Sequence, residues 1–260
     1  MVPLGLTLAG IGLAGSFVSG LLGVGGAAFI IPMLYYIPKW LGTGDLNMKE
    51  CAGLSIVLVL VGSLSGAIAH RGRSASCPQI TRIMAPATAI GALVGGLGSR
   101  WVPVAFLTGL FATLALLAGL LMFRPGTPGG DEVPAGRTIT FPERTGALIA
   151  LGVGLVAGLV GAGGAFILVP LMIYVLKIPT RVAMSSSLSV VFVSSIAGFI
   201  GKVAAGQIPW ALALVLVAGA VPGARWGAHL AARVKALFLR YGLAAITTLV
   251  AARMWADLLY

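Results

Sequence analysis

The sequence predicts an all-α polytopic membrane protein made of two inverted-topology repeats. Composition, a duplicated glycine motif and the placement of basic residues predict this fold. Of the 260 residues, 59% are hydrophobic and 9% are charged, whereas a soluble domain carries about 25% charged residues. At about 20 residues per span, the chain has room for roughly eight to ten membrane segments. The formal net charge of +11 comes from basic residues in short loops, which is typical of membrane topology and not of nucleic-acid binding.

A glycine-rich motif occurs twice. The stretch from Gly20 to Pro32, GLLGVGGAAFIIP, recurs 138 residues later as GLVGAGGAFILVP. The similarity continues at an offset of 132, which pairs Ser55 with Ser187 and Gly91 with Gly223. Repeats at about 1–123 and 145–260 therefore flank a polar Pro/Gly-rich linker, 124–144. We expect one membrane transport domain, 1–260, that arose by duplication.

Each repeat contains four apolar blocks, and the first block is too long for one span. The blocks cover 3–38, 51–69, 79–99 and 102–123 in the first repeat, and 145–177, 182–201, 208–231 and 236–258 in the second. We expect each first block to form a Gly/Pro-broken helical hairpin, either two spans or a span plus a re-entrant half-helix. Three further spans complete each repeat.

Basic residues distinguish the two topologies. If each long block crosses the membrane once, eight basic residues lie inside and nine outside. If each block turns back, twelve lie inside and five outside, as the positive-inside rule requires. Those five are Lys39, Lys49, Arg100, Lys202 and Arg253. The sequence thus predicts inverted repeats with both termini outside and a cytoplasmic linker.

The paired glycine motifs predict a substrate site at the midplane. Gly/Pro-interrupted segments at matching positions of two repeats mark transporter binding sites. A helix that starts at such a break presents unpaired N–H groups and a partial positive charge, which suit an anion. Close packing of small residues is the alternative reading. The candidate residues are Gly23, Gly25, Gly26, Gly161, Gly163 and Gly164, with helix kinks at Pro32 and Pro170.

Hydroxyl groups and one arginine extend the candidate site. Ser185, Ser186 and Ser187 open one span, and Ser55 is the counterpart of Ser187. These hydroxyls can donate to an oxyanion or bond between helices. Arg225 lies inside an apolar segment, where it can contact substrate or serve an interfacial or gating role.

The remaining polar residues indicate a protein without enzymatic or metal chemistry. All six acidic residues lie in loops, in the linker or at segment ends. No metal-ligand spacing, phosphate loop or catalytic motif is present, so we expect no cofactor and no metal. Cys51 and Cys77 flank one apolar segment; a single span would hold them on opposite sides of the bilayer, too far apart for a disulfide.

Several of these segments resemble the TauE/SafE family of sulfite exporters, also called TSUP permeases. The resemblance rests on both glycine motifs, on AGLSIVLVLVGSLSGAIAHRGR and on AMSSSLSVVFVSSIAGF. It implies a bacterial-type inner (plasma) membrane permease for a small sulfur-containing anion such as sulfite, sulfoacetate or thiosulfate. The chain departs from the family in SSSLS, where members show a TSL-like triplet, and in the less polar AGLSI of the first repeat.

The expected activity is alternating access at the midplane site, with net export. An inside-negative potential favours anion exit by about 2.3 kcal/mol per charge per 100 mV, and no membrane carboxylate offers ion coupling, although His70 or His229 can carry protons. The alternatives are an anion channel, a membrane sulfur enzyme or scaffold that uses Cys51 or Cys77, and a permease for another small solute. No oligomeric state is predicted.

Overall fold

The computed structural model describes residues 2–22, 27–70, 77–123, 142–231 and 248–258, and every regular element in these ranges is a helix. The helices are α1 (Val2–Leu22), α2 (Ala27–Trp40), α3 (Met48–His70), α4 (Pro78–Gly98), α5 (Val104–Phe123), α6 (Glu143–Val160), α7 (Ala165–Tyr174), α8 (Thr180–Ala204) and α9 (Trp210–Ala231), with a last helical segment at 248–258. Each predicted apolar block contains helix, and both long first blocks contain two helices. The all-helical prediction is confirmed.

Local sequence explains where the central helix begins. At the start of α3, the Asn47 N–H donates to Glu50 Oε2 at 2.9 Å, and the Glu50 N–H donates to Asn47 Oδ1 at 3.0 Å. This reciprocal pair is a capping box, which satisfies two N–H groups that the first turn leaves without helical partners. From Cys51 to Val59, every side chain but that of Val57 is then buried, as expected for a helix at the centre of the bundle.

Several helices have the length and surface of membrane spans. Within the described ranges, four segments are long and apolar enough to cross a bilayer: Pro78–Gly98, Glu143–Val160, Ser185–Ala204 and Trp210–Gly227. In α4 the small residues Gly91 and Gly95 are buried, while Ile90 and Val94 are 58% and 53% exposed. Small residues inside and large apolar residues outside are typical of helices that face lipid.

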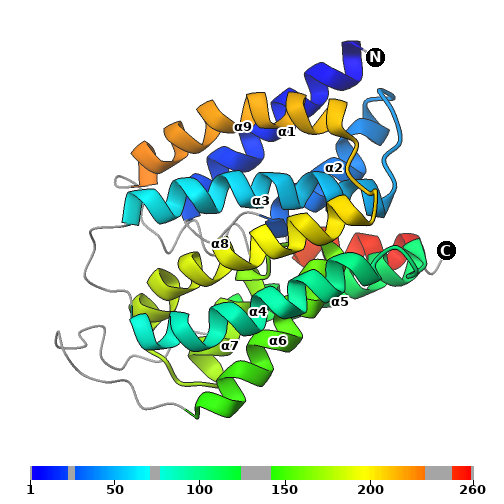
Figure 1. Cartoon of the computed structure of the whole chain (residues 1–260). Coiled ribbons are helices and arrows are strands. Elements are labelled where there is room, and N and C mark those ends of the chain that lie inside the picture. The colour runs from blue at the N-terminus through cyan, green and yellow to red at the C-terminus, as the bar shows by residue number, and fades with distance from the viewer. Residues whose placement is uncertain (1, 23–26, 71–76, 124–141, 232–247, 259–260) are drawn as a thin grey trace.

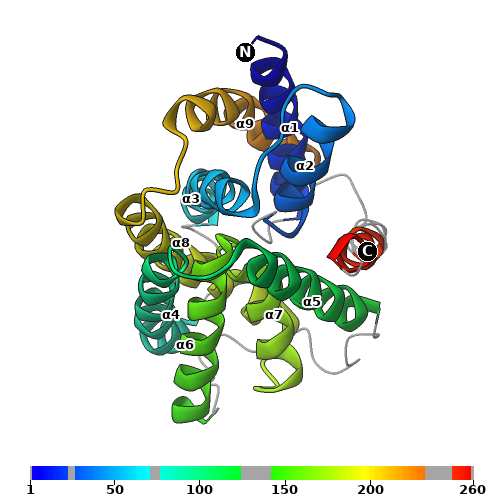
Figure 2. The ribbon, with the colours of Figure 1, turned by 90° about the vertical axis from the view of Figure 1, so that its right-hand side faces the viewer.

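The helices form two groups that each combine both repeats (Figures 1 and 2). One group contains α1, α2 and α3 with α9, and they share a core that includes Leu8, Leu54 and Leu216. The other contains α6, α7 and α8 with α4, α5 and the last helical segment, around a core that includes Phe111 and Phe166. At the offset of 132, α4 and α9 are counterparts, so each repeat contributes its α4-type helix to the other repeat's core.

Glycines at equivalent positions make equivalent contacts between helices. A Cβ added at Gly91 would overlap the carbonyl oxygen of Leu151, where α4 meets α6. A Cβ added at Gly223 would overlap the carbonyl oxygen of Leu13, where α9 meets α1. Because Leu13 and Leu151 are themselves 138 residues apart, one packing arrangement is built twice. Glycine permits backbones to approach this closely, as at membrane helix interfaces generally.

The counterpart helices α3 and α8 also touch each other. The hydroxyl oxygens of Ser63 and Ser195 lie 3.2 Å apart, and these residues are 132 positions apart, which is the repeat offset. In Figure 1, α3 runs from right to left and α8 from left to right, and α9 and α4 are opposed in the same way. Ser63 and Ser195 therefore join two antiparallel helices at positions that the sequence offset pairs.

Candidate functional site

The second glycine motif breaks a helix. α6 ends at Val160, and Gly161 follows in the left-handed conformation with φ 73°, its N–H donating to the Ala157 carbonyl. Gly163 and Gly164 also have positive φ, 64° and 78°, in a region that side chains other than glycine rarely adopt. α7 then begins at Ala165 without a side-chain cap. The Ile167 and Leu168 N–H groups donate to the Gly164 carbonyl, which leaves the N–H groups of Ala165 and Phe166 without helical acceptors.

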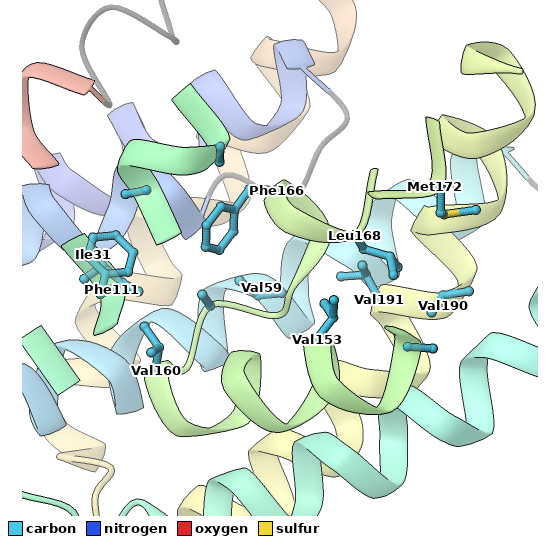
Figure 3. Close-up of a cluster of buried hydrophobic side chains, with 14 of the residues drawn as sticks. Ile31, Val59, Phe111, Val153, Val160, Phe166, Leu168, Met172, Val190 and Val191 are labelled. Carbon is cyan, nitrogen blue, oxygen red and sulfur yellow. The ribbon is translucent and has the colours of Figure 1, made fainter. Parts of the chain in front are cut away.

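The broken segment packs against α3. A Cβ at Gly161 would overlap the Ala52 carbonyl oxygen, and one at Gly163 would overlap the Val59 side chain. Figure 3 shows Val59 beside the chain that joins α6 to α7, with Val160 before the break and Phe166 after it. The glycines therefore let the loop lie directly on the central helix of the other repeat.

Ser55 lies on this face of α3. It is three residues after Ala52 and four before Val59, so helical spacing puts all three on one side of α3. Its side chain is 0% exposed, and its hydroxyl oxygen has no hydrogen-bond partner. A buried hydroxyl without a partner loses about 1–3 kcal/mol of solvation without compensation. Ser55 is thus a donor available for a ligand at the break.

The serines that open α8 are in different surroundings. Ser186 is buried, and its hydroxyl accepts a hydrogen bond from the Cys77 N–H at 3.2 Å, which joins the starts of α8 and α4. Ser187 is buried and Ser185 half-buried, and both have interaction partners. Cys51 and Cys77 are free thiols.

The other predicted site residues are distributed as follows. Pro170 lies inside α7 and Pro32 inside α2, and both are buried. Because proline has no N–H, Pro170 leaves the Phe166 carbonyl without its helical donor. Arg225 has an exposed side chain on α9, so contact with substrate stays a prediction. Gly23, Gly25 and Gly26 lie outside the described residues.

Sequence reasoning missed Lys202, which it treated only as a basic residue on the outer side. The side chain lies in the last turn of α8 and is 0% exposed. Its Nζ donates to the Leu159 carbonyl at 2.9 Å and to Gln207 Oε1 at 2.8 Å. One signal was present: the offset of 132 pairs Lys202 with His70, so both central helices carry a basic residue at the same position.

Comparison with known proteins identifies the family. The model of the sulfite exporter TauE/SafE family matches residues 8–254. The chain belongs to the TauE/SafE family. It is therefore a membrane transporter, and the resemblance found in the glycine motifs and serine blocks is confirmed. No solved structure matches the chain significantly.

Three relatives show how far this TauE/SafE similarity extends. A probable membrane transporter protein of Xylella fastidiosa strain Temecula1 is 29% identical over 259 residues, which cover 97% of each chain. The probable membrane transporter protein YunE of Bacillus subtilis is 29% identical over 84% of this chain and 85% of its own. YdhB of the same bacterium, also named a probable membrane transporter protein, is 29% identical over 80% of this chain and 83% of its own.

Proposed function

We propose that this TauE/SafE transporter is a permease for a small sulfur-containing anion, and that the anion binds at the break between α6 and α7 beside Ser55. The observation that carries the proposal is the Ser55 hydroxyl, which is fully buried, has no partner and lies on the helix face that contacts the glycine loop. The uncapped start of α7 adds N–H donors and a partial positive charge of roughly half a unit. These donors suit an oxyanion.

The charge distribution supports an anion over a cation. Among the described acidic residues, Asp45, Glu143 and Asp257 are exposed, and Glu50 is used in the capping box of α3. No described carboxylate therefore faces the break, where it would repel an anion. By the repeat relation, we extend the proposed site to Ser187 and to Gly23, Gly25 and Gly26.

We further propose that the repeats have inverted topology, with the pseudo-two-fold axis in the membrane plane. The opposite directions of counterpart helices and the contact between Ser63 and Ser195 support this arrangement. Basic residues that this topology places on the outer side also lie close to one another in the structure, although they come from different segments. Lys49 Nζ donates to the Arg100 carbonyl at 2.9 Å, and the Arg253 guanidinium lies 5.5 Å from the Trp40 ring centre, near Lys39.

Thiol accessibility tests this topology. Ala204, exposed at the end of α8 two residues after Lys202, and Gly129 of the linker would each be replaced by cysteine in a Cys51→Ser/Cys77→Ser background. A membrane-impermeant thiol reagent added to intact cells should label the Ala204→Cys protein, and should label the Gly129→Cys protein only after the cells are opened. Labelling of both proteins from the same side would refute the inverted arrangement.

Ser55→Ala tests the site with flux into proteoliposomes. For sulfite, thiosulfate, sulfoacetate and sulfate, we expect the variant to lose about tenfold in kcat/KM on its transported anion, the effect of one hydrogen bond to a charged group. Thermal stability should stay the same or rise, because the hydroxyl has no partner to lose. The matched control is Ser63→Ala on the same helix, which should keep the wild-type KM.

The same assay tests the mechanism. Alternating access predicts flux that saturates with substrate and accelerated exchange when the anion is present on both sides. A linear flux without exchange would favour the anion channel. Export is expected when an inside-negative potential is imposed, because that potential drives an anion outward. Unchanged kcat/KM in Ser55→Ala would refute the proposed site.

A further inference from the structure

Lys202 joins four segments of the molecule at the end of α6. Besides its bonds to the Leu159 carbonyl and Gln207 Oε1, it shares Gln207 with Ser99 at the end of α4, whose Oγ donates to the same amide oxygen at 2.9 Å. Among the charged side chains whose burial the structure describes, Lys202 is the only one that is buried. The oxygens that its Nζ contacts there are neutral, and no carboxylate is among them.

This cluster is next to the helix break. Leu159 precedes Gly161 by two residues. α3 also connects the two places, because Gly161 packs on the carbonyl of Ala52 while the neighbouring Gly53 packs on the carbonyl of Gln207. Gln207, which accepts a hydrogen bond from Lys202, and the glycine loop therefore lie against consecutive residues of one helix.

The break itself poses an electrostatic problem for an anion. The start of α7 carries a partial positive charge, but the end of α6 lies at the same break and carries a partial negative charge of similar size. Apart from the Ala157 carbonyl, which accepts from the Gly161 and Ala162 N–H groups, its last carbonyl groups have no donors from a following turn. With both ends present, the two helix dipoles largely cancel, and the carbonyl end of α6 opposes anion binding.

Lys202 offsets the partial negative charge at the end of α6. Its bond to Leu159 satisfies one of the last carbonyls of α6, and a cation at a helix C-terminus offsets the negative end of the dipole. In its protonated form Lys202 carries a full positive charge, which exceeds the partial charge of about half a unit that it faces. A buried cation without a carboxylate partner also retains its attraction for a mobile anion.

We propose that Lys202 sets the charge selectivity of the transport path, by cancelling the negative end of α6 and making the Gly161–Gly164 break electropositive. Lys202 acts as a positioning and electrostatic residue for the anion. The inference rests on the proposed function, because it assigns a source of selectivity to the same site.

Three variants separate the charge of Lys202 from its hydrogen bonds, and a fourth serves as the control. Lys202→Arg keeps the charge, Lys202→Gln keeps a donor without the charge, and Lys202→Met loses both. Lys49→Met is the matched control, since Lys49 also bonds to a backbone carbonyl, that of Arg100 at 2.9 Å, but is only half-buried. In sulfite flux into proteoliposomes, Lys202→Gln and Lys202→Met should raise KM at least tenfold. Lys202→Arg should remain within about threefold of wild type, and Lys49→Met should match wild type.

A second measurement does not depend on the substrate. In the Cys51→Ser/Cys77→Ser background, Ser55→Cys would be reacted with a sulfonate-bearing and an ammonium-bearing thiosulfonate reagent. The rate with the anionic reagent divided by the rate with the cationic reagent reports the local electrostatic potential. We expect this ratio to be high in the Ser55→Cys protein and to fall about tenfold when Lys202→Gln is added. If Lys202→Met fails to fold, the rate ratio measured with Lys202→Gln still tests whether the charge of Lys202 sets the local potential.

The outcomes distinguish this inference from the proposed function. Equal KM values and equal rate ratios for wild type and Lys202→Gln would overturn the role of Lys202 while leaving the permease intact. Loss of function in Lys202→Arg equal to that in Lys202→Gln would also overturn it, because charge would then not be the cause. If wild-type protein moved none of the anions while the rate ratio still depended on Lys202, the sulfur-anion proposal would fail and the electrostatic inference would stand.

Discussion

The helix pairs at the two sides of the molecule are alike, whereas the two central helices are not. α4 contacts α6 where Gly91 lies against the Leu151 carbonyl, and α9 contacts α1 where Gly223 lies against the Leu13 carbonyl. These two leucines occupy equivalent positions of the glycine-motif repeats. On the central helices, Ser55 has no partner while its counterpart Ser187 has one. Lys202 likewise stands where the first repeat has His70. Positions paired by the repeat offset therefore agree in these packing contacts and differ at these polar residues.

The largest expected effect tests the likeness of the packed pairs. Gly91→Leu and Gly223→Leu should each abolish monodisperse protein on size-exclusion chromatography, because the added side chain meets a backbone carbonyl that cannot move independently. The smaller Gly91→Ala and Gly223→Ala should each destabilise by about 1–3 kcal/mol, the usual effect of overpacking.

Gly98→Ala on α4 is the control for this pair. It has no neighbouring atom within 4 Å of an added Cβ, so thermal unfolding should be unchanged or slightly raised by the better helix propensity of alanine. A destabilising effect at Gly91 with none at Gly223 would show that the two interfaces are not equivalent.

A smaller effect is expected where the helix breaks. Gly161→Ala adds the strain of a left-handed residue, about 1–2 kcal/mol, and overlaps the Ala52 carbonyl. Gly206→Ala is matched in conformation, with φ 68° against 73°, but an added Cβ there meets nothing within 4 Å. Thermal unfolding should therefore fall further for Gly161→Ala, and only this variant should lose anion flux. Equal losses in both would mean that the close approach to α3 has no role.

The sequence was sufficient to predict the helices, the break at Gly161–Gly164 and the pairs of positions that are compared above. Apolar blocks separated by polar residues predicted the helices, because membrane spans need long apolar runs. Three glycines in four residues predicted the break at Gly161–Gly164, since glycine at that density disfavours a continuous helix. Two repeats of one motif also predicted which positions correspond, such as Gly91 and Gly223.

The rest depended on contacts between distant segments. Nothing in the local sequence distinguishes Ser55, which lacks a partner, from Ser186, which bonds to the Cys77 N–H. Lys202 lies near the end of an apolar block, where a lysine ordinarily extends toward water. Its burial against Leu159 requires the packing of α6, α8 and the loop before α9. Only the pairing of Lys202 with His70 hinted at a special position.

The smallest expected effect tests the centre of the comparison, where α3 and α8 meet. Ser63 Oγ also donates to the Leu60 carbonyl at 3.1 Å and Ser195 Oγ to the Phe192 carbonyl at 2.8 Å, so little donor capacity is left for the bond between them. Ser63→Ala and Ser195→Ala should each destabilise by about 1 kcal/mol or less. A double-mutant cycle on thermal unfolding should give a coupling of about 0.6 kcal/mol, the average found between membrane helices. Crossing Ser63→Ala with Thr113→Val, whose hydroxyl bonds only within α5 to the Gly109 carbonyl, should give no coupling. A coupling near zero in the cycle of Ser63 with Ser195 would show that the contact between the two hydroxyls does not stabilise this helix crossing.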